Sequence, residues 1–148
     1  MERNEKHIDV LNDLIRINND RVDGYEKAAS ETKDIDADLR AMFHQYAQES
    51  KQYASELRQL VQQFGGDPAE DTTVSGKIYR VWMDMKAFVM GKDRKTVLEN
   101  CEFGEDAAQK AYKTALEEDE LSPEVRELIV NQKSSLKQAH DTIKKYRD

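Results

Sequence analysis

The sequence is poor in residues that interrupt helices and in residues that crosslink a chain. Its 148 residues include one cysteine, two prolines and six glycines. A single cysteine excludes an internal disulfide and a cysteine-rich zinc site. So few prolines and glycines favour long uninterrupted helices. No stretch approaches the roughly 20 apolar residues that a membrane-spanning helix needs.

Positive charge is also in deficit. Lys and Arg total 23 against 30 Asp and Glu, which gives a formal net charge of −7. Binding to the phosphates of nucleic acid needs a basic surface, so we expect no nucleic-acid partner. The first residues, Met1–Asn4, precede no apolar run, and we therefore expect no signal peptide. These features predict a soluble, cytoplasmic, all-α protein that does not associate with membranes.

Apolar residues recur at steps of three and four along four long segments, which is typical of helices with one buried face. The predicted helices cover about 4–32, 37–64, 94–119 and 123–146. A shorter amphipathic stretch over 74–90 is long enough to return the chain from one end of a bundle to the other. The sequence thus predicts one four-helix-bundle domain over residues 1–148, with two helical hairpins joined by a short crossover helix.

The two predicted hairpins resemble each other in sequence. An offset of 87 residues aligns Asn18 with Glu105 and Tyr25 with Tyr112. Two amphipathic helices share apolar positions by chance, but matched tyrosines are more specific. We interpret the pattern as a duplicated helical hairpin.

Each predicted helix carries polar residues where its core-facing stripe should be apolar. These residues are Asn18, Ser50, Glu105, Gln132 and His140. Three lie near a helix midpoint, and the last two bracket the midpoint of the fourth helix. Because midpoints meet at one level of a bundle, we expect a buried polar layer. A buried carboxylate is costly unless it is paired, so Glu105 needs a partner, for which His140, Asn18 and Gln132 are the candidates.

Ferritin-like proteins build a di-metal site at this level of the bundle. The chain resembles that superfamily in helix order, crossover and duplication, and Glu105 followed by Tyr112 resembles a rubrerythrin-type ligand helix. Over nearly its full length the chain is similar to a bacterial ferritin-like family of unassigned function. The phrases that carry the resemblance are Leu11-Asn12-Asp13-Leu14-Ile15, Asp23-Gly24-Tyr25-Glu26-Lys27-Ala28-Ala29, Gly65-Gly66-Asp67-Pro68 and Gly104-Glu105-Asp106-Ala107-Ala108. The resemblance implies the fold and names no activity.

Most ligands that the resemblance implies for a di-metal site are missing. Such a site takes one glutamate from each of two helices and Glu-x-x-His from the other two. Asn18 stands where the first glutamate is required, and Lys137-x-x-His140 has a lysine in place of a carboxylate. The remaining candidate metal ligands are Glu105, Glu102 one turn earlier, and His140. Two divalent ions need several carboxylates, so the sequence predicts a degenerate metal site.

Two hypotheses for function follow. The first is a non-enzymatic helical bundle with no catalytic residues and no cofactor, acting as a structural or interaction module. A link to stress comes only from the superfamily resemblance. The alternative is a metal-binding oxidoreductase or iron-handling protein with a single divalent ion near Glu105 and His140. The sequence does not indicate a small-molecule substrate under either hypothesis.

The crossover segment is unusually apolar for its length. Trp82, Met85 and Phe88 lie on it, and part of their surface must cover the bundle. Apolar surface left exposed would mark an interface, and tryptophan is enriched among interface anchors. We therefore expect a homodimer or another partner contact through this segment.

Overall fold

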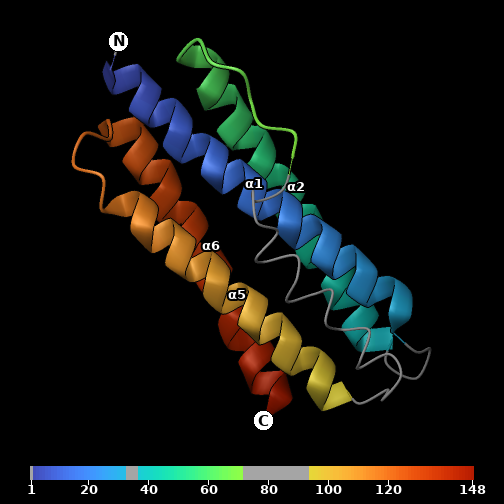
Figure 1. Ribbon diagram of the computed structural model, residues 1–148. Coiled ribbons are helices and arrows are strands. Elements are labelled where there is room, and N and C mark those ends of the chain that lie inside the picture. Colours follow the sequence, from blue (N-terminus) through green and yellow to red (C-terminus); the bar gives the residue numbers. More distant parts are fainter. Residues whose placement is uncertain (1, 33–36, 72–93) are drawn as a thin grey trace.

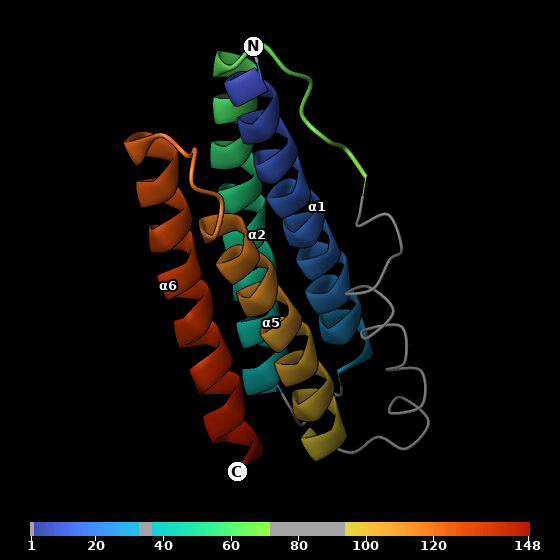
Figure 2. The ribbon, with the colours of Figure 1, turned by 60° about the vertical axis from the view of Figure 1, so that its left-hand side comes forward.

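A computed structural model describes residues 2–32, 37–71 and 94–148. Four helices make up most of this part of the chain: α1 (Glu2–Glu31), α2 (Ala37–Gln63), α5 (Arg94–Leu116) and α6 (Pro123–Arg147). They lie roughly along one axis (Figure 1), and the view of Figure 2 shows the same bundle from another side. Helix α1 packs mainly against α2, and α5 packs mainly against α6. The predicted all-α four-helix bundle of two hairpins is confirmed.

The helices begin and end close to the predicted residues. The largest difference is at the end of α5, which was predicted to reach Asp119 and ends at Leu116. The predicted crossover helix over 74–90 lies outside the described residues. Among the described helices, none is long and apolar enough to cross a membrane.

Local chemistry explains where two of the helices end or begin. Gly65 has a φ of 83°, a left-handed conformation that glycine adopts without strain, and its N–H returns to the carbonyl of Gln62. At the start of α6, the Ser122 hydroxyl accepts a hydrogen bond from the Val125 N–H, and proline follows at the first helical position.

An arginine from α6 explains why α5 stops at Leu116. The Arg126 guanidinium donates to the carbonyl of Leu116 at 3.1 Å and to that of Glu118 at 2.8 Å. It thereby satisfies carbonyls that a longer helix would bond internally. The acidic run over 117–120 also opposes the dipole at a helix C-terminus.

The residues that follow α2, as far as Asp71, are hydrogen-bonded to polar side chains of α1. The Asn12 amide donates to the carbonyl of Asp67 at 3.1 Å, and the Asn19 amide donates to the carbonyl of Asp71 at 2.8 Å. Between them, the Arg16 Nε lies 2.9 Å from the Asp71 carboxylate. Polar residues at successive turns of α1 thus direct the start of the connection along this helix.

The core fills the space between the helices along the length of the bundle. Its apolar residues come from all four helices and include Leu11, Ile15, Phe43, Leu57, Leu98, Ile129 and Leu136. Burial of this apolar surface is the main favourable term in folding. The core is interrupted by a set of buried polar side chains, which form the candidate functional site.

Candidate functional site: a buried polar layer with an arginine

The structure places four of the five predicted layer residues in the core. Asn18, Ser50, Glu105 and Gln132 each come from a different helix, and each is at most 2% exposed. The prediction for His140 is wrong, because its side chain is 18% exposed and lies at the boundary between α5 and α6.

Arg21 of α1 is the partner of Glu105. Both side chains are fully buried. The Arg21 Nη2 donates to Glu105 Oε2 at 2.8 Å, and its Nε donates to Oε1, so that both carboxylate oxygens are bound. None of the three partners expected from the sequence fills this role. A planar guanidinium suits it better than an amide or imidazole, because its fork of N–H groups matches a carboxylate.

The remaining N–H groups and the faces of the guanidinium also have neighbours. The Arg21 Nη1 donates to the Ser50 hydroxyl at 2.6 Å and to the Tyr46 carbonyl at 3.4 Å. The guanidinium carbon lies 5.1 Å from the centre of the Tyr25 ring and 5.7 Å from that of Tyr46. Both distances are typical of cation–π contacts. These contacts thus compensate the Arg21 guanidinium for the hydration that it loses on burial.

The charge on Arg21 is fixed. Burial favours the neutral form, but the adjacent Glu105 carboxylate outweighs burial and raises the pKa of Arg21 above its ordinary value. Burial, together with Glu105, raises the pKa of Tyr25 well above its usual range. The layer therefore holds a permanent cation, and the hydroxyl of Tyr25 beside it is neutral at physiological pH.

A second hydrogen-bonded chain in the core contains no charged side chain until it approaches the surface. The Asn18 amide donates to the Tyr112 hydroxyl at 2.8 Å, which in turn donates to Gln132 Oε1 at 2.6 Å. The Gln132 Nε2 then donates to Glu56 Oε1 at 3.1 Å and to the Tyr53 carbonyl at 3.3 Å. This chain links α1, α5, α6 and α2 in turn, so it fixes the relative positions of all four helices.

His140 belongs to a separate group at the surface. Its Nε2 lies 2.6 Å from Asp106 Oδ1 on α5, and its Nδ1 lies 3.0 Å from Asp141 Oδ1. The Glu102 carboxylate lies 3.9 Å from the same Nε2 and is also bound by Arg147. Burial favours the neutral imidazole, but Asp141 and Asp106 raise the pKa of His140. This group joins α5 to α6.

The three candidate metal ligands therefore do not share one centre. Glu105 is bound to Arg21 in the core, whereas Glu102 and His140 belong to the surface group. Within the described ranges, no group of three or more His, Cys, Asp and Glu side chains is placed to hold a metal ion. The layer does not fit the di-metal centre that the ferritin-like resemblance implies, because a guanidinium already binds both oxygens of its glutamate.

Four buried polar residues were missed in the sequence: His7, Asp20, Arg21 and Thr32. For Arg21 a signal exists, since it lies three residues after Asn18 and four before Tyr25, both of which are on the predicted stripe. Arginine is rarely buried, so this spacing was not interpreted as a core position. The predicted interface residues Trp82, Met85 and Phe88 lie outside the described residues.

Comparison with known proteins identifies the fold and the family. The structure is similar to that of a mutant of Mycobacterium smegmatis Dps1, with a TM-score of 0.81 and 11% sequence identity over 99% of this chain and 98% of the other. This likeness shows a ferritin-like four-helix bundle. No curated protein matches the chain. Residues 6–118 match the family model described as a domain of unknown function, DUF2383, and the chain belongs to that family.

Proposed function

We propose that this protein is a non-catalytic ferritin-like module with a structural or interaction role, in which a buried arginine takes the place of metal ions. One observation carries the proposal: Arg21 binds both carboxylate oxygens of Glu105 in the centre of the bundle. In a ferritin-like site a carboxylate is neutralised by bound cations. Here the neutralising cation is part of the chain.

The geometry disfavours an added ion at this level for two reasons. A divalent ion needs lone pairs, and those of Glu105 directed into the layer are engaged by N–H groups. It would also lie near a guanidinium whose charge cannot be removed, and like charges repel strongly in a medium of low dielectric constant. The partners of Arg21 thus favour a fixed polar core over a reactive centre.

The alternative hypothesis of a single ion between Glu105 and His140 has less support. Glu105 is directed to Arg21, and the two ring nitrogens of His140 are directed to Asp106 and Asp141. An ion shared by Glu105 and His140 would require both residues to give up these partners.

Metal analysis tests the proposal. Protein purified without an affinity tag or chelator is incubated with Fe²⁺, Mn²⁺ or Zn²⁺, desalted and examined by elemental analysis and thermal unfolding. We expect no stoichiometric metal and no metal-dependent stabilisation. Two irons per chain, or one ion that is lost in Glu105→Gln, would overturn the proposal.

Arg21→Gln is the matched control, because it removes the resident cation and leaves the carboxylate in place. Any stabilisation by added ions should be larger in this variant than in the unmodified protein. An ion that stabilises the unmodified protein more than Arg21→Gln would contradict the assigned role of Arg21.

The interaction role includes a proposed homodimer or other partner contact through Trp82, Met85 and Phe88. Sedimentation of the full chain and of Trp82→Ala tests this part separately. We expect an oligomer that Trp82→Ala weakens. A monomer at all concentrations would remove the homodimer from the proposal.

A further inference from the structure

A polar pocket of about 560 Å³ lies between α1, α2 and the residues that follow α2. Figure 1 shows the two helices side by side, with the chain after α2 running back along them. The cations that line the pocket are Lys51 and Arg58 on α2. The carboxylates are Asp23 on α1 and Glu70 and Asp71 after α2. The pocket therefore has one cationic side and one anionic side.

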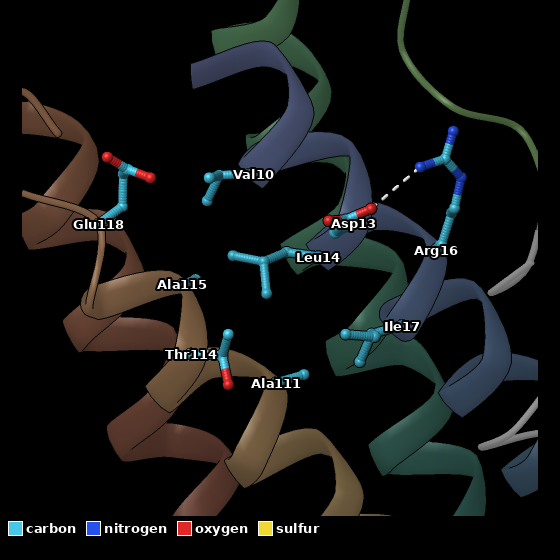
Figure 3. Close-up of a pocket in the computed structure, with 9 residues that line it drawn as sticks. All are labelled: Val10, Asp13, Leu14, Arg16, Ile17, Ala111, Thr114, Ala115 and Glu118. Atoms are coloured by element: carbon cyan, nitrogen blue, oxygen red, sulfur yellow. Dashed lines mark hydrogen bonds and ion pairs between the residues drawn. The ribbon is translucent and has the colours of Figure 1, made fainter. Parts of the chain in front are cut away.

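Two of these charged residues are paired within the chain. The Lys51 Nζ lies 2.7 Å from Glu26 Oε1 on α1. The Arg16 Nε lies 2.9 Å from Asp71 Oδ1. Figure 3 shows Arg16 extending from α1 on the side away from α5, and it also bonds to Asp13. Lys51 and Asp71 are thus compensated without a ligand.

Arg58 and Asp23 have no counter-ion in the part of the chain that the structure describes. The half-buried Arg58 donates one long hydrogen bond, 3.4 Å from its Nη2 to Asn19 Oδ1. Burial and the neighbouring Glu26 carboxylate raise the pKa of Asp23, and no cation offsets them. The exposed Glu70 is likewise unpaired among the described residues. A cation on one side of the pocket and carboxylates on the other are therefore available to a ligand.

Asn19 holds the two sides of the pocket in position. Its Nδ2 donates to the Asp71 carbonyl at 2.8 Å, while its Oδ1 accepts from Arg58. One amide thus links α2 with the chain that follows it. Val22 and the buried Ala54 also line the pocket, and the short alanine side chain leaves room between the helices. The pocket is therefore preformed, which lowers the entropic cost of binding a ligand.

We propose that this pocket binds a small zwitterion with one carboxylate and one ammonium group, as in an amino acid. The ligand carboxylate would accept from the Arg58 guanidinium, whose fork of N–H groups matches it. The ammonium would lie beside Asp23 and Glu70. A simple anion would be repelled by these carboxylates, and a simple cation would be repelled by Arg58. The site involves neither Arg21 nor Glu105, so this inference goes beyond the structural role proposed above.

A series of ω-amino acids is a suitable probe, since its members are zwitterions of different length. Glycine, 4-aminobutanoate and 6-aminohexanoate are titrated into the full-length, ¹⁵N-labelled protein, and binding is followed by nuclear magnetic resonance. Butanoate and butylamine are the controls, because each carries only one of the two charges. We expect saturable shifts of the Asn19 side-chain amide, and at least one zwitterion that binds about fivefold or more tightly than either control. No saturable shift, or equal binding of a control, would overturn the proposal.

Two matched pairs of variants locate the site. Arg58→Gln should weaken binding of the best zwitterion about fivefold or more. Its control is Arg94→Gln, at an arginine outside the lining that is paired with Asp38, and this change should leave binding unaltered. Asp23→Asn should weaken binding about two- to fivefold, whereas Asp9→Asn, at an exposed position of α1 outside the lining, should have no effect. Equal affinities within either pair would overturn the proposal.

The probes with a single charge assign each residue its role. Asp23→Asn removes a repulsion, so it should improve binding of butanoate while it weakens binding of the zwitterion. Arg58→Gln should improve binding of butylamine for the same reason. Weaker binding of every probe in both variants would contradict these roles. Asp23 is exposed, so its variant keeps the test decisive if Arg58→Gln fails to fold. No arm of the experiment depends on metal content, so its failure is distinguishable from failure of the arginine-for-metal proposal.

Discussion

Removal of the Arg21 side chain is the sharpest test of how this core is held together. Arg21→Met keeps an unbranched side chain of good helix propensity but deletes the guanidinium. The change removes two charge-assisted bonds to Glu105 and one bond each to the Ser50 hydroxyl and the Tyr46 carbonyl, all in the buried core. It also leaves the Glu105 carboxylate buried without its cation.

The expected cost is about 3–5 kcal/mol, the usual range when one member of a buried ion pair is deleted. For a protein of this size that loss corresponds to roughly 10 °C or more in the midpoint of thermal unfolding. Arg21→Lys should lie between Arg21→Met and the unmodified protein, since it keeps the charge but loses the bidentate geometry. Urea unfolding followed by circular dichroism measures all three.

A double-variant cycle separates pairing from packing. Glu105→Gln alone should also destabilise, because it leaves a buried guanidinium without its carboxylate. Arg21→Met combined with Glu105→Gln should recover much of the loss, since no unpaired charge remains. If the two single changes cost less than about 1 kcal/mol each and simply add, Arg21 and Glu105 are not the coupled pair that we describe.

The remaining predictions concern single contacts. Tyr112→Phe should cost about 1–3 kcal/mol, because it leaves two buried amides without their shared hydroxyl partner, whereas Tyr146→Phe at an exposed position should cost under about 0.5 kcal/mol in the same urea assay. The pKa of His140 is raised in the folded protein, so its stabilisation is fully present below about pH 6.5 and is lost as the pH rises through the folded-state value. Stability measured across this interval should fall less steeply in His140→Gln than in the unmodified protein, and His44→Gln is the control. Gly65→Ala should cost about 1 kcal/mol, since alanine is strained at this positive φ, and an unchanged thermal midpoint would contradict this reading.

The helices could be predicted because their signals are local and repeated. Apolar positions at steps of three and four recur over many turns, and Gly65 and Ser122 mark ends whose chemistry acts within a few residues. The end of α5 was predicted less accurately, because it is set by Arg126, which lies outside the helix and reaches back from the next one. A helix end that is set by a tertiary contact gives little signal in the sequence of the helix itself.

The polar layer was only half predictable for a related reason. The positions of Asn18, Ser50, Glu105 and Gln132 follow from helix periodicity, but periodicity does not show which side chains meet. The need for a partner of Glu105 was evident from the cost of a buried carboxylate. That Arg21 is this partner was not evident from the sequence. Burial of an arginine is favourable only where a carboxylate, a hydroxyl and aromatic rings already surround it.

The predicted duplication explains why one cation suffices. In the alignment of the two hairpins, Asn18 is the counterpart of Glu105, and Tyr25 is the counterpart of Tyr112. The neutral Asn18 bonds to Tyr112 and needs no counter-ion, whereas the charged Glu105 of the second hairpin is bound by Arg21 of the first hairpin. With the same offset Arg21 aligns with Ala108, so the guanidinium has no counterpart in the second hairpin. A carboxylate in one half and an arginine in the other thus form a matched pair across the two hairpins, and we expect neither to be tolerated without its partner.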